Sequence, residues 1–191
     1  MHWRNTPRGY GWVTIVLHWT GAVLLGVLLP LGLWMTGLDY YDPWYRRAPD
    51  LHRSLGALFG LLLVLRIAVR LGERPPAPIE PTDWQRRAAG LTHLAMYLLP
   101  AALVVSGYLI STADGRPLAV FDWFEVAATL HGIEGQADVA GEIHFALAML
   151  LLAVVAIHVL AVAYHQFILR DATLRRMLRP DRESGSKGES R

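Results

Sequence analysis

Four long runs of apolar residues constrain this chain more than any other feature of its sequence. They occupy residues 12–34, 51–69, 91–110 and 143–168. Each is close to the twenty or so residues that an α-helix needs to cross the hydrocarbon core of a bilayer. The sequence therefore predicts an all-α fold, an integral membrane four-helix bundle surrounded by membrane lipid, rather than a soluble globule.

Basic residues are distributed unevenly between the two sides of such a bundle. If both termini and the connection at 70–90 share one side, that side carries fourteen of the eighteen lysines and arginines, and the other side has only Arg46, Arg47, Arg53 and Arg116. Connections rich in Lys and Arg stay in the cytoplasm. We therefore expect both termini to be cytoplasmic, in a multi-pass protein of the bacterial inner (plasma) membrane.

The connections between the runs differ in composition. The connection after the second run is rich in proline, which suits an extended crossing. The connection at 111–141 is long and acidic, and its aromatic segment 117–130 suits a short helix at the membrane interface. We expect one four-helix domain at 1–180, followed by a disordered cytoplasmic tail at 181–191.

Histidines inside the apolar runs fall at two matched depths. His52 and His144 lie toward the periplasmic side, and His18 and His158 lie toward the cytoplasmic side. His144 and His158 are fourteen residues apart, nearly four helical turns, so they project from one face about 21 Å apart. Facing imidazoles from two helices of one bundle are what a six-coordinate haem iron requires. His93, at the start of the third run, is the competitor of His18 for the cytoplasmic-side pair.

Other features narrow the chemistry. The chain has no cysteine, which excludes disulfides, iron–sulfur clusters and covalently attached c-type haem from it. Three glycines near the histidines are expected to make room for a flat macrocycle: Gly21, Gly56 and Gly60. The same glycines would also suit ordinary close packing of helices.

Four alternatives to haem binding would also place histidines inside the apolar runs. Each histidine could simply hydrogen-bond across helices. A zinc site would need a second histidine four residues away or a neighbouring carboxylate, and a proton or ion pump would need acidic residues within its spans. Residues 55–69, 91–110 and 143–168 contain no Asp or Glu. A transporter with helices broken at Pro30 and Pro100 is the fourth alternative.

Over residues 8–180 the sequence resembles the bacterial cytochrome b561 family, which is similar in turn to the cytochrome b subunits of nickel–iron hydrogenases and formate dehydrogenases. The resemblance rests on "LHW" at His18, "LHRSLG" at His52, "GLTHLAMYLLPAALVVSGYL" in the third run, the His144/His158 spacing and the terminal "RDATLRRML". It implies four helices that bind two b-type haems, with the iron ligands at His18, His52, His144 and His158.

The resemblance also implies a function. Such a cytochrome carries electrons between the quinone pool, here ubiquinone, and a small periplasmic redox species such as superoxide, as an oxidoreductase. The alternative is a membrane anchor and electron conduit for a separate periplasmic redox partner, which the acidic 111–141 connection would dock if that partner were basic. Both axial positions of each iron are filled, which favours outer-sphere electron transfer over oxygenase chemistry. No nucleic-acid partner is expected.

Three arginines and two further histidines are candidates for supporting roles. Arg53 is placed to pair with haem propionates on the periplasmic side. Arg66 and Arg70 could do so on the cytoplasmic side, or could extend to lipid head groups. His93 and His165 are candidates for a quinone pocket or proton route, or for ordinary interfacial positions.

Overall fold

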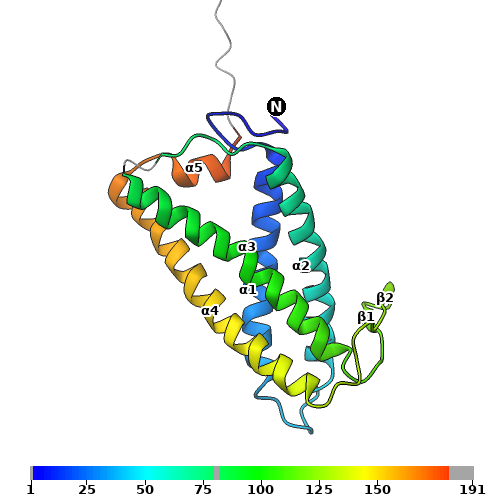
Figure 1. The fold of residues 1–191 in the computed structure, drawn as a ribbon. Coiled ribbons are helices and arrows are strands. Elements are labelled where there is room, and N and C mark those ends of the chain that lie inside the picture. The colour runs from blue at the N-terminus through cyan, green and yellow to red at the C-terminus, as the bar shows by residue number, and fades with distance from the viewer. Residues whose placement is uncertain (1, 80–81, 181–191) are drawn as a thin grey trace, which may run out of the picture.

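Four long helices form the body of the protein (Figure 1). In the computed structural model, which describes residues 2–79 and 82–180, they are α1 (Trp12–Met35), α2 (Arg47–Gly72), α3 (Asp83–Ser111) and α4 (Gln136–Tyr164). All four are long and apolar enough to cross a membrane, and in the span Gln136–Leu169 only 6% of the apolar window is buried within the protein. The outer surfaces of these helices therefore suit a lipid environment, and the prediction of a helical, multi-pass membrane protein is confirmed.

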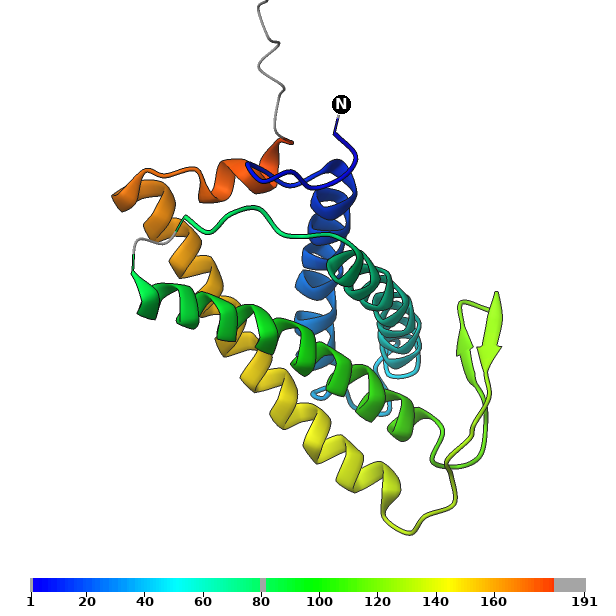
Figure 2. The same ribbon diagram turned by 45° about the horizontal axis from the view of Figure 1, so that its top comes forward.

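The helices pack in two pairs. α1 packs against α2, α3 packs against α4, and α2 joins the pairs through α3; the two pairs run at an angle to each other (Figures 1 and 2). α3 begins eight residues before the apolar run that predicts it, because the polar segment from Asp83 continues the helix. His93 therefore lies ten residues inside α3, and its placement at the start of that helix was wrong.

One end of the bundle gathers both ends of the described chain, and we call it the terminal end (Figure 1). The amide of Ala77 donates a 3.0 Å hydrogen bond to the carbonyl of Pro7. The carbonyl of Ala77 in turn accepts from Arg176 at 2.8 Å, and Trp19 Nε1 donates to the carbonyl of Met177 at 2.7 Å. The N-terminal segment, the connection after α2 and helix α5 (Thr173–Leu178) thus form one hydrogen-bonded layer.

The opposite end carries a β-hairpin, and we call it the hairpin end. Strands β1 (Leu118–Val120) and β2 (Phe124–Val126) pair antiparallel, with Val120 opposite Phe124. The predicted interfacial helix in this segment is therefore wrong, and the fold is mostly helical rather than all-α.

Two contacts explain why a hairpin forms there. Phe121 and Asp122 adopt left-handed backbone angles, φ 48° and 59°, which turn the chain back on itself. The Phe121 amide then donates a 3.1 Å hydrogen bond to Ser54 Oγ on α2, while Val120 is fully buried. These contacts dock the hairpin on α2, two residues after His52.

A topology experiment tests the direction of the bundle in the membrane. We expect the terminal end to be cytoplasmic, because it carries most of the basic residues. A fluorescent reporter fused to the C-terminus should be active, and a phosphatase reporter that folds only in the periplasm should be inactive there. The reverse pattern would invert the direction. The predicted disordered tail at 181–191 lies outside the described residues.

Candidate functional site

Each of the four long helices contributes two residues fourteen positions apart to the interior of the bundle. Fourteen residues are nearly four turns, so the members of each pair share a face and lie about 21 Å apart along the helix. The terminal-end cluster consists of His18, Arg66, His93 and His158; the hairpin-end cluster consists of Gly32, His52, Gly107 and His144. Only the spacing on α4 was recognised in the sequence. The same spacing on the other three helices is the signal that identifies the remaining members.

In the hairpin-end cluster, two histidine rings meet between two glycines. The ring centroids of His52 and His144 are 6.2 Å apart. A Cβ on Gly32 would lie 3.0 Å from Cε1 of His52, and one on Gly107 would lie 3.3 Å from Cε1 of His144. The rings therefore pack closely against the backbones of α1 and α3, and a side chain at either glycine would require the facing ring to shift.

The three glycines expected beside the macrocycle have different surroundings in the structure. A Cβ on Gly56 would have open space around it, and a Cβ on Gly60 would lie 3.0 Å from Cγ1 of Val104 on α3. Gly60 thus provides close contact between α2 and α3. Gly21 lies near Leu62 and Arg66, at the depth of the terminal-end cluster.

Ser106 determines which nitrogen of His144 carries the proton. Its hydroxyl lies 2.9 Å from the carbonyl of Ala102 and 3.2 Å from that of Leu103, and 3.0 Å from Nδ1 of His144. With its single hydrogen donated to one of these carbonyls, the Ser106 oxygen accepts from Nδ1–H of His144. Nε2 of His144 therefore keeps its lone pair, which is the form that binds a metal.

The terminal-end cluster brings three histidines and one arginine together. The ring centroids of His93 and His158 are 5.8 Å apart. Arg66 donates from Nη2 to Nδ1 of His18 at 3.0 Å, and its guanidinium carbon lies 5.4 Å from the centre of the Tyr97 ring. His18, His93 and His158 are close enough to one another to interact electrostatically. Both His18 and His93 are thus neighbours of His158.

The donor sets suit an iron that is already held in a porphyrin. Bonds from a metal to an imidazole nitrogen are about 2 Å long, so two axial rings on one metal have centroids about 6 Å apart. The His52–His144 and His93–His158 separations are of this size. Nδ1 of His52 is buried without a hydrogen bond, with the carbonyl of Leu28 near the ring. Within residues 2–79 and 82–180, no three His, Asp or Glu side chains gather as a metal site built from protein alone requires.

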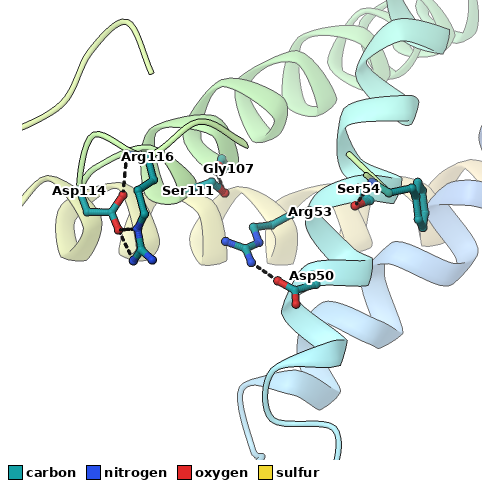
Figure 3. A network of polar contacts seen from close by, with 8 residues as sticks. Asp50, Arg53, Ser54, Gly107, Ser111, Asp114 and Arg116 are labelled. Atoms are coloured by element: carbon teal, nitrogen blue, oxygen red, sulfur yellow. Dashed lines mark hydrogen bonds and ion pairs between the residues drawn. The ribbon is translucent and has the colours of Figure 1, made fainter. Parts of the chain in front are cut away.

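A charged pocket of about 610 Å³ opens at the hairpin end beside this cluster (Figure 3). Arg53, next to His52, forms an ion pair with Asp50 of the same helix, and Arg116 forms one with Asp114. The hydrogen bond from Arg116 lowers the pKa of Asp114 below its ordinary value. Three arginines and three aspartates line the pocket, so their formal charges balance: Arg47, Arg53, Arg116, Asp50, Asp114 and Asp122.

At the terminal end, α4 ends in an unusual turn that brings His165 to a carboxylate. Residues His165–Leu169 form the π-helix η1, and Arg170 then reverses the chain with φ 54°. Nδ1 of His165 lies 2.5 Å from Oδ2 of Asp171. Single π-turns in α-helices are frequent at functional sites.

The carboxylate of Asp171 is held in its ionised form. Burial alone would raise the pKa of Asp171, but hydrogen bonds from Thr173 and His165 lower it below its ordinary value. A carboxylate can only accept, so Nδ1 of His165 carries the proton and Nε2 is left to exchange one.

Arg70, which the sequence offers as a partner of haem propionates or of lipid head groups, is exposed on α2.

Known proteins are similar in sequence to this chain over most of its length. The chain matches the family described as prokaryotic cytochrome b561 over residues 9–180. It is 46% identical over 179 residues to cytochrome b561 homolog 2 of Escherichia coli (strain K12), a match that covers 93% of this chain and 95% of that protein. It is 28% identical over 174 residues to the probable superoxide oxidase CybB of Yersinia pestis, covering 90% of this chain and 96% of that protein.

Replacing Ser106 tests the hydrogen bond to His144. In Ser106→Ala, His144 loses its Nδ1 acceptor, and partners of this kind typically contribute 10- to 100-fold to metal affinity. For a haem held by the hairpin-end cluster, we expect dissociation to be faster by roughly tenfold or more, measured by transfer to an excess of apomyoglobin. Ser111→Ala is the matched control, because Ser111 bonds only to its own helix, at the carbonyl of Gly107. Equal dissociation in both variants would contradict the role of Ser106.

Proposed function

We propose that this chain holds two b-type haems and carries electrons across the bacterial inner membrane. The chain belongs to the prokaryotic cytochrome b561 family of membrane haem proteins, and this membership is the starting point of the proposal. The electrons pass between ubiquinone and a small redox species on the periplasmic side. When bound, haem supplies one-electron transfer between ferric and ferrous iron. The protein supplies the ligands, the distance between the two sites and the charges around them.

The observation that carries this proposal is the occurrence of imidazole pairs at two depths on one helix. His144 and His158 share a face of α4, and each has a second imidazole within about 6 Å of its ring centroid. Two sites on one span provide a path over most of the thickness of the hydrocarbon core, since fourteen residues rise about 21 Å.

The iron ligands are assigned as His52 and His144 at the hairpin end and His18 and His158 at the terminal end. For the terminal end, the family resemblance favours His18, while the ring contact with His158 favours His93. The position of His93 ten residues inside α3 makes it a stronger competitor than its sequence position indicates. Variants of each residue separate the two assignments.

The charged pocket is the proposed place of reaction with the periplasmic species. It lies against α2 at Arg53, next to a proposed haem ligand, and it is the size of a site for a small polar molecule. One relative carries the name probable superoxide oxidase, and superoxide is a small anion that arginines of such a pocket can attract. Periplasmic superoxide is therefore the substrate we propose.

Quinone chemistry is proposed for the terminal end, near His165. Reduction of a quinone takes up protons with its electrons, so a proton-exchanging side chain is needed beside the acceptor. His165 lies seven residues, about 10 Å, beyond His158 on the same helix, and Asp171 fixes its tautomer. This contact supports a proton-delivering role for His165.

Haem stoichiometry and ligand variants test the site assignments. The purified protein should contain two low-spin b-type haems per chain. Replacement of His144 or His52 by alanine should remove the hairpin-end haem or make it high-spin, and replacement of His158 or His18 should do the same at the terminal end. The two effects should be nearly independent, because the sites share no ligand and are about 20 Å apart.

The outcome that would change the assignment is specific. If His93→Ala loses the terminal-end haem while His18→Ala keeps two low-spin centres, His93 is the ligand. A single haem per chain, or a high-spin spectrum of the unaltered protein, would contradict the pairing as a whole.

Quinone reduction by the purified, haem-loaded chain tests the function itself. With superoxide generated enzymatically, we expect the protein to reduce a soluble ubiquinone analogue without a partner. Asp171→Asn should slow this reaction on the order of 10²-fold, the size of a general acid–base contribution, with both haem spectra unchanged. The control is Asp83→Asn, because Asp83 is an exposed carboxylate paired with Arg86 at the same end. A chain that is inactive until a redox partner is added would favour the conduit role.

A further inference from the structure

Arg66 is held inside the bundle on two sides. Besides its hydrogen bond to His18, its guanidinium lies over the ring of Tyr97 from α3. Its Nη1 would also lie 3.8 Å from a Cβ on Gly21 of α1. On α2, Arg66 follows His52 by fourteen residues, so it holds in the terminal-end cluster the position that His52 holds in the hairpin-end cluster. Arg66 therefore does not extend along its helix to the lipid head groups, as one of its two predicted roles required.

The charge of Arg66 has no carboxylate beside it. In the described chain, the ion pairs of arginines join Arg4, Arg53, Arg86 and Arg116 to acidic partners, and Arg66 is in none of them. The apolar parts of α2, α3 and α4 contain no Asp or Glu. At the hairpin end the situation is the opposite, since Arg53 is paired with Asp50. Among the described residues, the terminal-end cluster thus contains a positive charge with no carboxylate of the protein paired to it.

The hydrogen bond between Arg66 and His18 is incompatible with iron binding by His18. A guanidinium can only donate, so Nδ1 of His18 has to accept. A neutral imidazole that binds iron through Nε2 carries its proton on Nδ1, and the two donors would then face each other. If His18 is the ligand, this hydrogen bond opens, while Tyr97 and Gly21 still hold the guanidinium in the cluster.

We propose that Arg66 raises the reduction potential of the terminal-end haem above that of the hairpin-end haem. The proposal rests on the proposed function, since it requires haem in both clusters. Reduction lowers the charge of the iron by one unit, and a nearby cation in a medium of low dielectric constant stabilises the less positive state. One electron at a time then moves from ferrous iron at the hairpin end to ferric iron at the terminal end, with no bond made or broken. Arg66 thereby directs electrons toward quinone.

A redox titration of the haem-loaded protein tests this role without any substrate. The two haems are distinguished by which absorption component disappears in His158→Ala. In Arg66→Gln, the ferrous-to-ferric ratio of the terminal-end haem at the wild-type midpoint should fall roughly tenfold, given a charge within about 10 Å at an effective dielectric constant near 20. The hairpin-end haem should be unchanged. Arg66→Lys should keep most of the wild-type ratio, because it keeps the charge.

Two further variants make the test specific. Arg74 is an exposed arginine at the same end of the molecule, and Arg74→Gln should leave both haems unchanged. Tyr97→Leu keeps the charge but removes the ring that holds it, so the ratio should fall in the same direction by a smaller factor. Electron paramagnetic resonance should show two low-spin ferric signals in every variant that is compared.

Several results would overturn the proposal. They are an unchanged terminal-end potential in Arg66→Gln with both haems low-spin, an equal change in Arg74→Gln, and equal changes in Arg66→Gln and Arg66→Lys. If Arg66→Gln does not take up the terminal-end haem, Tyr97→Leu decides, and an unchanged potential in that variant overturns the proposal. A wild-type protein with one haem would instead contradict the proposed function.

Discussion

A polar side chain inside a bilayer has to find its partner within the protein, because hydrocarbon offers none. This constraint determines where the histidines and the arginine of the spans lie. Five histidines of the spans and Arg66 face the interior of the bundle at one of two levels, where they meet side chains of the other helices. Because each helix is a regular spiral, a spacing of fourteen residues brings every helix back to the same face at the second level. The same spacing on all four helices is therefore sufficient to form the two clusters.

The partner of Nδ1 gives each histidine a different chemical character. In His144 the hydroxyl of Ser106 accepts from Nδ1, and Nε2 is free to bind a metal. In His165 the carboxylate of Asp171 accepts from Nδ1 at 2.5 Å, a charge-assisted bond that suits proton exchange at Nε2. In His18 the guanidinium of Arg66 donates to Nδ1. The partner at Nδ1 thus differs among the three histidines: a hydroxyl, a carboxylate and a guanidinium.

Features that depend on residues close together in the sequence could be predicted, whereas features that depend on contacts between distant residues could not. The spans are set by local composition, and the His52–His144 contact follows from helix length and direction alone. The hairpin could not be predicted, because it depends on one long-range bond from Phe121 to Ser54 and on left-handed backbone at two residues that are not glycine. Gly32 and Gly107 were missed for a different reason. A glycine beside a histidine of another helix leaves no trace in its own neighbourhood, and only comparison of spacings across all four helices identifies it.

The two ends of the bundle differ in how their charges are compensated, and this difference gives the molecule a direction. At the hairpin end, three arginines and three aspartates line one pocket, so a small charged molecule meets individual side chains rather than a strong overall field. At the terminal end, basic residues predominate on the surface, and Arg66 brings one charge into the interior beside the histidines. Surface charge of this kind sets the orientation of a membrane protein during insertion. A buried charge acts on whatever electron the interior accepts, because the low dielectric constant around it screens little. In the proposed function, the same bias toward arginine would place the terminal end in the cytoplasm and, through Arg66 beside the histidines, would favour electrons at that end.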